Sequence, residues 1–492
     1  MSAPKVFGIE TEYGIAFGGD PKLNAMVAST LLVSAYKELL DGSAEWDFHD
    51  EHPERDARGF EVPGDKAPTV EPTLTNVVLP NGARLYVDHA HPEYSTPECS
   101  DPLELVIHDL AGVVVMRRAV SQLLRNLPVG HWVRLYKNNS DGKGNSYGCH
   151  ENYLVDRSVP FEVLAEKLLP HLISRQIYCG AGKVGAEAGK GQCNFQISQR
   201  ADFFEEVIGL ETTIRRPIVN TRDEPHADPQ RFRRLHVIVG DANMAHIPTF
   251  LKIGTTALIL QMIEDGFIEK DLSLKDPVAS LHSVSRDLSC KQVLERTDGT
   301  TITAVELQWD YYELAQKWRE SYEHPPWTHR VLDLWREILE GLERDPLGLA
   351  SKLDWVAKWS VVEAYKDSRG VDWNDPKLAM IDLQYHDLRP DRGLYWKLEA
   401  EGRIDTLASL AEAERAESEP PESTRAYFRG RAIRRFAPQI VSANWDSIVF
   451  DTGASALQRL PMMNPTKGTK DQVGDLLDGC ADLEELLDAL SS

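Results

Sequence analysis

Carboxylates and histidines gather in residues 81–99, which read NGARLYVDHAHPEYSTPEC. After an Asn-Gly hairpin turn, long polar and apolar residues alternate, which predicts a strand over 84–88 with Arg84, Tyr86 and Asp88 on one face. Two prolines further along predict that the strand stops and a rigid loop follows. A carboxylate at a strand end, beside a loop that carries more carboxylates, is typical of a metal site or an acid–base site. A polar hairpin with solvated acids is the alternative.

A second pair of carboxylates lies near the start of the chain, in KVFGIETEY (residues 5–13). Apolar and polar residues alternate there, so a strand places Glu10 and Glu12 on the same face. Such a face is either solvated or supplies oxygen ligands to a metal ion. His150 begins another expected strand, and a lone histidine there is more often only hydrogen-bonded. His236, in a third strand-like segment, is a candidate partner that would favour a metal site.

The charge balance excludes one class of function. The 492-residue chain has 77 acidic residues against 54 lysines and arginines, a net charge of −23. This argues against a nucleic-acid binder, because phosphate neutralisation needs a basic face. Residues 214–237 supply a local basic patch that favours a nucleotide or an acidic protein partner, with ion-paired surface arginines as the alternative. Its six arginines are Arg215, Arg216, Arg222, Arg231, Arg233 and Arg234.

Cysteine usage and hydropathy predict the cellular compartment. The six cysteines are scattered, with no CxxC pair, which is typical of reduced thiols in the cytoplasm. No run of about 18 apolar residues occurs, and the N-terminus has no apolar core of signal-peptide length. We therefore expect a cytoplasmic protein without a membrane segment.

The length allows one large domain and a smaller one. An Asp-Pro start at residue 101 and a long apolar run predict a buried helix to about Asn126. Residues 41–80 contain five prolines, many acids and little periodicity, so we expect a long loop that is either a lid or disordered. An acidic segment with two prolines precedes residue 423. We expect a large domain over 1–422 and a small C-terminal domain over 423–492.

Five motifs spread along the chain resemble one family. They are GIETEYG (8–14), NGARLYVDHAHPEYSTPECSDP (81–102), GCHENYLV (148–155), RLHVIVGDANM (234–244) and NPTKGTKDQVGDLL (464–477). Together they are similar to the Pup-processing enzymes, carboxylate–amine ligase relatives of glutamine synthetase. This family comprises the Pup ligase and the depupylase/deamidase of Pup. DHAHPEYS, and the 41–80 insertion with RDARGF, resemble the depupylase branch rather than the ligase.

The resemblance implies an α+β, glutamine synthetase-like fold. An antiparallel β-sheet would form a cradle backed by helices, with ATP (or ADP) and Mg²⁺ in its concave face. Matched motif by motif, the implied metal ligands are Glu10, Glu12, Tyr86, Glu93, His150 and His236, with Glu98 as a further candidate. The implied contacts to nucleotide, phosphate or Pup are Arg84, Thr96, Asn152, Arg200, Arg222, Arg234 and Trp445. Asp88 matches the catalytic aspartate.

The resemblance also implies amide hydrolysis that depends on ATP and Mg²⁺. The enzyme would cleave the isopeptide bond between the C-terminal side-chain carboxyl of Pup and a substrate lysine, and deamidate a C-terminal glutamine of Pup to glutamate. Asp88 would be the nucleophile or the base that activates water. The implied partners are Pup, pupylated proteins and ATP, with neither nucleic acid nor membrane. The alternatives are a Pup–protein ligase that consumes ATP and a silent Pup-binding protein, which clustered carboxylates disfavour.

Overall fold

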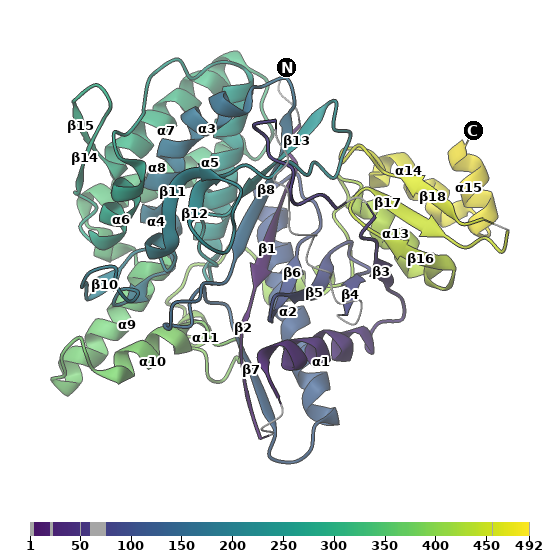
Figure 1. Cartoon of the computed structure of the whole chain (residues 1–492), viewed down its shortest axis with the longest axis horizontal. Helices are drawn as coiled ribbons and strands as arrows, with labels where there is room; N and C mark the ends of the chain where they lie inside the picture. Colours follow the sequence, from purple (N-terminus) through teal and green to yellow (C-terminus); the bar gives the residue numbers. More distant parts are fainter. Residues whose placement is uncertain (1–3, 20–22, 50, 60–74, 455, 492) are drawn as a thin grey trace.

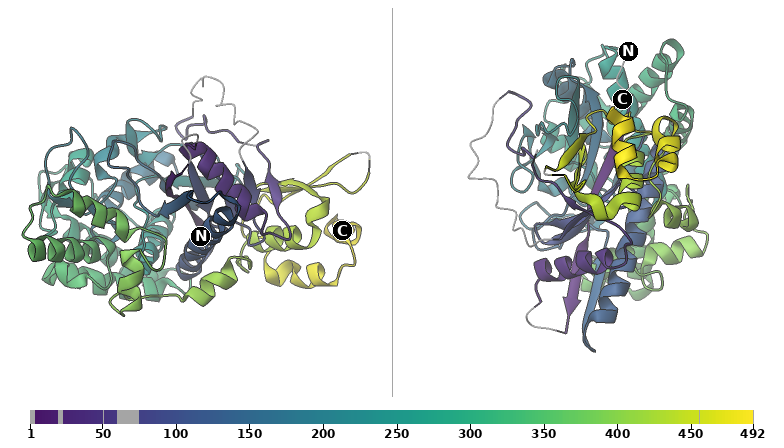
Figure 2. Two further views of the ribbon diagram at one scale, coloured as in Figure 1. Left: turned by 90° about the horizontal axis from the view of Figure 1, so that it is seen from below. Right: turned by 90° about the vertical axis from the view of Figure 1, so that its right-hand side faces the viewer.

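The computed structural model describes residues 4–19, 23–49, 51–59, 75–454 and 456–491. Within this part of the chain, a large sheet runs through the middle of the molecule and helices pack against it (Figure 1). The expected α+β class is confirmed. Figure 2 shows the C-terminal segment as a lobe at one end of the molecule, opposite the helical region of residues 304–385.

Ten strands make the central sheet. In order across it they are β13 (Phe232–Val237), β8 (Cys149–Asp156), β1 (Phe7–Glu12), β6 (His91–Ser95), β5 (Arg84–Asp88), β4 (Asn76–Val78), β3 (Ala44–Trp46), β16 (Ile440–Ala443), β17 (Ser447–Phe450) and β18 (Gln458–Pro461). The strand expected over 84–88 is confirmed as β5. Neighbours are antiparallel except β3 and β16, which run parallel. The expected antiparallel sheet is therefore mixed at this one junction.

The register of three strands brings distant residues to one face of the sheet. Glu10 on β1 pairs with His150 on β8, and Asn152 on β8 pairs with His236 on β13. Because side chains alternate between the two faces of a strand, Glu12 shares the face of Glu10, as the alternation predicted. The two histidines that the sequence separates by 86 positions thus meet beside one carboxylate.

The rigid loop that we expected after Asp88 is instead a second strand, so that prediction was wrong. β6 begins at His91, after a two-residue turn in which His89 takes a φ of +52°. Pro92 is tolerated because it lies just past the last residue pair between β1 and β6. At this position the Pro92 carbonyl accepts the N–H of Tyr13 at 3.0 Å. Proline has no N–H group to donate, but a donor is not needed at the end of the β1–β6 pairing.

Two long helices form much of the packing behind the sheet. α2 (Pro102–Asn126) has the predicted span, and the side chain of Asp101 caps it by accepting the N–H of Leu103 at 2.7 Å. α5 (His246–Glu264) is buried along nearly its whole length. α5 packs against both α2 and β8. An all-round apolar helix such as α5 is stable only when other elements surround it.

The remaining elements surround this core. The further helices are α1 (Ala25–Lys37), α3 (Phe161–Ser174), α4 (Gln176–Cys179), α6 (Pro277–Arg286), α7 (Ala304–Ser321), α8 (Thr328–Arg344), α9 (Asp354–Arg369), α10 (Pro376–Tyr385), α11 (Leu394–Ala400) and α12 (Leu410–Ala416). Two-stranded sheets pair β2 (Gly14–Gly18) with β7 (Trp132–Tyr136), β9 (Lys183–Val184) with β10 (Phe195–Gln196), β11 (Phe204–Gly209) with β12 (Arg216–Asn220), and β14 (Val293–Glu295) with β15 (Thr301–Thr303).

Part of the segment that we expected to be a long loop, 41–80, has regular structure. β3 and β4 lie in it and join the central sheet. Between them, the carboxylate of Asp56 accepts a hydrogen bond from the Thr221 hydroxyl at 2.6 Å, so this part is attached to the segment that follows β12. Residues 50 and 60–74 lie outside the described residues, and the lid stays a prediction.

The C-terminal segment extends the central sheet. It contains α13 (Ala426–Phe436), the strands β16 to β18, α14 (Lys470–Gly479) and α15 (Leu483–Ser491). These elements share a small hydrophobic core with Ala44, Trp46 and Val78 of β3 and β4. The expected domain boundary at residue 423 stays a prediction, because the sheet and this core continue across it.

Candidate active site

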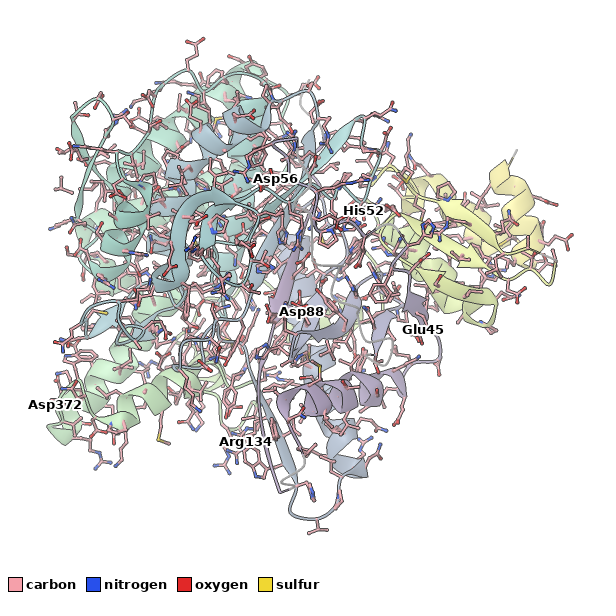
Figure 3. The ribbon with its side chains drawn as sticks, viewed as in Figure 1. Glu45, His52, Asp56, Asp88, Arg134 and Asp372 are labelled. Atoms are coloured by element: carbon pink, nitrogen blue, oxygen red, sulfur yellow. The ribbon has the colours of Figure 1, made fainter. Side chains whose placement is uncertain are left out.

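Two clusters of possible metal ligands lie next to each other on one face of the sheet. The first is Glu10, His150 and His236, and the second is Glu12, Asp88 and Glu93; within each, the ligand atoms lie within 4.8 Å of one another. They are adjacent because Glu10 and Glu12 are two residues apart on β1 and Glu12 pairs with Glu93 on β6. Figure 3 places Asp88 near the centre of the molecule.

The first cluster has a preorganised carboxylate. His150 Nδ1 lies 3.5 Å from Glu10 Oε2, and the Asn152 amide donates to Glu10 Oε1 at 2.9 Å. His236 Nδ1 lies 3.0 Å from the amide oxygen of Asn152, which leaves its Nε2 buried. Among the described residues this Nε2 has no hydrogen-bond partner. A buried imidazole nitrogen without a partner, beside a carboxylate, suits a metal ligand.

The second cluster consists of carboxylates alone. Glu12 Oε1 accepts the N–H of Gly148 at 2.6 Å. Asp88, at the end of β5, has its Oδ2 at 2.9 Å from Nδ1 of His89. The Asp88 side chain is 39% exposed, whereas Glu93 is buried. Asp88 is therefore the member of this cluster that a large substrate can reach.

The two clusters differ in electrostatics. Burial alone raises the pKa of Glu10, but the hydrogen bond with His150 and the charges around it, Arg234 included, bring that pKa below its ordinary value. Burial and the neighbouring carboxylates, Asp88 foremost, raise the pKa of Glu93 well above its ordinary value. A carboxylate crowded by like charges is stabilised by a proton or a metal cation. The second cluster thus has an excess of negative charge.

Asp88 is nevertheless held in its ionised form. Burial alone raises its pKa, but the hydrogen bond and charge of His89, with the charges of His150 and Arg84, hold the pKa below its ordinary value. The hydrogen bond with Asp88 raises the pKa of His89 in turn. An ionised carboxylate that is partly exposed beside an imidazole is suited to act as a nucleophile or a base.

Tyr86 and Arg84 lie on the same face of β5. Tyr86 pairs with Glu93 across the β5–β6 ladder and forms a hydrogen bond with it. Burial raises the pKa of Tyr86 well above its ordinary value, so the phenol stays protonated and orients the carboxylate. The Arg84 guanidinium stacks 3.7 Å above the Trp46 ring and 3.9 Å above the Tyr86 ring. Its Nε donates to Asn76 at 3.0 Å, which fixes a positive charge beside the clusters.

A pocket borders Glu10, and its empty space, part of which is open to solvent, is about 570 Å³. Its lining includes four of the residues expected to contact a nucleotide: Thr96, Asn152, Arg234 and Trp445. Gly8 forms part of its wall, and a Cβ there would lie 3.3 Å from the Thr96 hydroxyl oxygen. Arg234 and Arg425 in its lining bring positive charge. The pocket therefore offers charge for an anionic ligand next to the clusters of possible metal ligands.

Sequence reasoning missed two residues that line this cavity, His226 and Arg425. Burial, with the charges of Arg234 and Arg425, lowers the pKa of His226 well below its ordinary value, so its ring is neutral. Arg425 is buried, at the start of α13. A run of arginines over 425–435 was a usable signal for Arg425. No local pattern distinguishes His226.

The two arginines expected on the phosphate or Pup side differ. Arg200 is fully buried; its Nη1 donates to the Gly240 carbonyl and its Nε to the Ser146 hydroxyl, both at 3.1 Å. As placed, Arg200 supports backbone around the site, and a contact with a ligand stays a prediction. Arg222 lies near the positive side chain of Arg234, and its buried Nε has no partner among the described residues. Arg222 is therefore free to meet an anion.

Glu98 is not part of either cluster and pairs with two arginines instead, so its role as a metal ligand stays a prediction without support from the geometry. Arg425 Nε donates to its Oε1 at 2.8 Å, and Arg429 Nη1 donates to the same oxygen at 3.1 Å. Burial alone raises the pKa of Glu98, but these two guanidinium groups lower it to about 2. Glu98 joins the central hairpin to the C-terminal segment.

The residues present fit bound cations. Mg²⁺ prefers oxygen ligands. The second cluster offers three carboxylates, and the first offers one carboxylate and two imidazoles. The unpartnered Nε2 of His236 and the raised pKa of Glu93 are two independent observations that favour positive charge here. Fold and site together define a class: α+β proteins in which two clusters of possible metal ligands on a sheet adjoin a pocket for an anionic ligand.

Comparison with known proteins shows the family. Residues 5–449 match the family model described as Pup-ligase protein, and the chain belongs to this family. It is 51% identical over 500 residues to "Depupylase" of Acidothermus cellulolyticus, covering 99% of each chain. It is 44% identical over 497 residues to "Pup deamidase/depupylase" of Mycolicibacterium smegmatis, covering 99% of this chain and 100% of the other. The resemblance in the sequence motifs is confirmed.

Solved structures agree. The complex between Prokaryotic Ubiquitin-like Protein Pup and its ligase PafA is similar with a TM-score of 0.80 and 34% identity, over 99% of this chain and 94% of that chain. The Pup ligase PafA in complex with ADP has a TM-score of 0.74 and 38% identity, over 82% and 89% of the two chains. The fold that the resemblance implied is confirmed. Among the described helices, none has both the length and the apolar character to span a bilayer.

Proposed function

We propose that this enzyme hydrolyses side-chain amides at the C-terminus of Pup: it cleaves the isopeptide bond to a substrate lysine and deamidates a terminal glutamine. The observation that carries the proposal is the 51% identity to a depupylase over 99% of both chains, against 34% and 38% to solved Pup ligases. In this proposal the enzyme works in the cytoplasm on Pup and pupylated proteins, with ATP (or ADP) and Mg²⁺ as cofactors.

The two clusters hold the metal ions in this proposal. Glu10, His150 and His236 would hold one ion, and Glu12, Glu93 and Tyr86, the ligands that the resemblance implies, would hold the other. When bound, Mg²⁺ supplies positive charge that offsets the negative charge developing on the amide oxygen. The metal would also satisfy the unpartnered Nε2 of His236 and relieve the repulsion at Glu93.

Asp88 carries the reaction. Its carboxylate, held 2.9 Å from His89, either attacks the amide carbonyl carbon or accepts a proton from an attacking water. In the first route the C–N bond breaks, the amine leaves with a proton, and water hydrolyses the resulting anhydride. In the second route water adds directly, and the amine leaves as the carbonyl re-forms. Both routes give the same carboxylate and free amine.

The cavity beside Glu10 binds the nucleotide. Trp445, whose ring contacts that of Trp46 with centroids 5.4 Å apart, would supply an aromatic surface for the nucleotide from the C-terminal segment. Thr96 and Asn152 would supply polar contacts, and Arg234 would supply positive charge for the phosphates. The remaining arginines expected here, Arg84, Arg200 and Arg222, add positive charge around this end of the sheet. Residues 423–492 therefore act as a small domain that completes the pocket of the large domain, 1–422.

The 41–80 insertion acts as a lid in this proposal. Figure 3 shows His52 and Asp56 above Asp88 in that view. Asp56 is bound to Thr221 at 2.6 Å, and the N–H of His52 donates to the carboxylate of Glu224. Glu224 also pairs with Arg234, which lines the cavity. Movement of the insertion would therefore change the position of Arg234 in the nucleotide pocket.

A second candidate is the reverse reaction, ATP-consuming ligation of Pup to lysine. The similarity of the whole chain to a Pup ligase, with a TM-score of 0.80, favours it. The metal and nucleotide residues serve both reactions equally. Only the use of the nucleotide separates the two candidates: a hydrolase retains it, whereas a ligase consumes one ATP for each bond.

The deciding experiment incubates the enzyme with ATP, Mg²⁺ and a Pup–lysine isopeptide conjugate, and follows free Pup by mass spectrometry and ADP by chromatography. Release of Pup without matching ADP formation is the expected result. Conjugation of glutamate-ended Pup with one ADP per bond, and no release, would assign the enzyme to ligation instead.

A further inference from the structure

Arg216 places a positive charge at the edge of the second cluster. It begins β12, after the loop 210–215, and its side chain is half-buried. Its charge acts on Glu12 of that cluster and on His89, the partner of Asp88. From a strand outside the central sheet, the guanidinium thus lies on the side of the site that carries Glu12 and His89.

The contacts of Arg216 fix its position without neutralising it. Its Nε donates to the Thr212 carbonyl at 2.8 Å, and its Nη2 lies 3.4 Å from the Ser146 carbonyl. Ser146 is two residues before Gly148, whose N–H binds Glu12. The Phe203 ring lies under the guanidinium, 5.6 Å away. Both hydrogen-bond acceptors are uncharged, and among the described residues Arg216 forms no ion pair.

Apart from Arg222, which lies beside Arg234 and His236 on the Glu10 side, the other arginines near the site are engaged. Arg234 pairs with Glu224 at 3.3 Å, and Arg84 is stacked between aromatic rings. Arg425 donates to Glu98. Arg200 donates to buried carbonyl groups. Arg216 is therefore the guanidinium on the Glu12 side of the site that keeps its charge for a ligand, judged over the part of the chain that the structure describes.

The substrate of the proposed reaction has a charge that needs such a partner. Its reacting amide is on the side chain of a C-terminal residue, so the same residue carries a free α-carboxylate. With carbon–carbon bonds near 1.5 Å, the two groups of a glutamine or glutamate are about 5 Å apart. An anion so close to Glu12, Asp88 and Glu93 is repelled unless a fixed cation binds it.

We propose that Arg216 determines specificity by binding the free α-carboxylate of the substrate's terminal residue while the adjacent side-chain amide lies at Asp88. The planar guanidinium binds a carboxylate through two parallel hydrogen bonds. This inference rests on the proposed function. It explains how an active site rich in carboxylates selects a chain terminus and rejects internal glutamine, which lacks the α-carboxylate.

The test compares two peptides with the C-terminal sequence of Pup ending in glutamine: one has a free α-carboxylate and the other an α-carboxamide. Ammonia release from the side chain gives kcat and KM for the wild type and for Arg216→Gln. We expect the wild type to prefer the free acid at least 10-fold in kcat/KM. Arg216→Gln loses this preference, through a KM at least 10-fold higher for the free acid and an unchanged value for the carboxamide.

Two further variants keep the test specific. Arg215→Gln removes the same charge from the exposed neighbouring residue and should retain the preference. Arg216→Lys keeps a charge without the planar pair of donors and should restore part of it. Folding of each variant is checked by thermal unfolding, and binding of fluorescent forms of both peptides to the wild type and to Arg216→Lys is measured by anisotropy, which gives the preference independently of turnover.

The outcomes separate the two proposals. If the wild type hydrolyses both peptides equally and binds them equally, the role of Arg216 is wrong while the hydrolase stands. An equal loss of kcat on both peptides in Arg216→Gln, with KM unchanged, assigns Arg216 to the reacting oxygen and also overturns the inference. If the wild type hydrolyses neither peptide, the proposed function fails and this inference fails with it.

Discussion

Two glutamates that lie close together in the sequence, Glu93 on β6 and Glu98 just past its end, have opposite environments. Glu98 meets two guanidinium groups, Arg425 and Arg429, and its pKa falls to about 2. Glu93 meets carboxylates, and its pKa rises well above the ordinary value. The charge of Glu98 is balanced by these arginines, and the ion pairs join the chain after β6 to the C-terminal segment. The cluster that contains Glu93 is incomplete without a cation, which is how a binding site differs from a structural ion pair.

The largest expected effect is catalytic. Replacing Asp88 by Asn keeps the size of the side chain but removes the anion that attacks or activates water, so kcat for isopeptide cleavage should fall by about 10³–10⁴-fold. Nucleotide binding, measured by calorimetry, should stay within a few-fold of the wild type, because Asp88 does not line the cavity. Retained cleavage in this variant would contradict the role given to Asp88.

The next effect is on stability. Glu98→Gln leaves Arg425 and Arg429 buried without a counter-charge, which should lower the free energy of unfolding by about 3–5 kcal/mol in urea titrations. The matched control is Glu419→Gln, which breaks an exposed pair with Arg434 and should cost less than about 1 kcal/mol. Equal effects of the two variants would remove the distinction between Glu98 and a surface ion pair.

The same ion pair predicts a pH dependence. The ordinary pKa of Glu98 is 4.5 and the folded value is about 2. A lowered folded pKa means that the stabilisation is complete above about pH 4.5 and is lost as the pH falls toward 2. The difference in unfolding free energy between the wild type and Glu98→Gln should therefore be constant from pH 7 to 5 and shrink below 4.5. A difference that persists unchanged at pH 3 would contradict the lowered pKa.

Glu93 should behave in the opposite way. Without divalent metal, Glu93→Gln should change the unfolding free energy by less than about 1 kcal/mol, because a glutamate with a raised pKa already resembles the neutral amide. In excess Mg²⁺ the wild type should gain about 2–3 kcal/mol, and Glu93→Gln should gain less. Melting temperatures with MgCl₂ and with EDTA test this, with Glu98→Gln expected to gain as much as the wild type.

Local patterns predicted the strands of the site but not all of its partners. The alternation at residues 5–13 and 84–88 placed Glu10, Glu12 and Asp88 correctly, because a strand of period two leaves little choice of face. Pro92 led us to predict a loop where β6 lies, since nothing in the local sequence shows that Pro92 falls at the end of the β1–β6 pairing.

Long-range contacts account for the other differences. The partners of Glu98 lie more than 320 residues away, so no spacing rule could separate it from the true cluster members. β3 was hidden in a segment that is rich in acids and prolines, and only its pairing with β4 and β16 makes it a strand. The resemblance implies a ligand contact for Arg200, and no local pattern shows its burial, because that burial depends on backbone from residues 238–240.

The parallel pairing of β3 with β16 also has a consequence for biosynthesis. Glu45 and Ser442 are partners, about 400 residues apart. A ribosome adds roughly 5–20 residues per second, so β3 emerges on the order of 20–80 s before the strand that covers it. Throughout this interval residues 44–46 lack the strand that covers them in the folded protein, and an uncovered strand edge is a template for association with other chains.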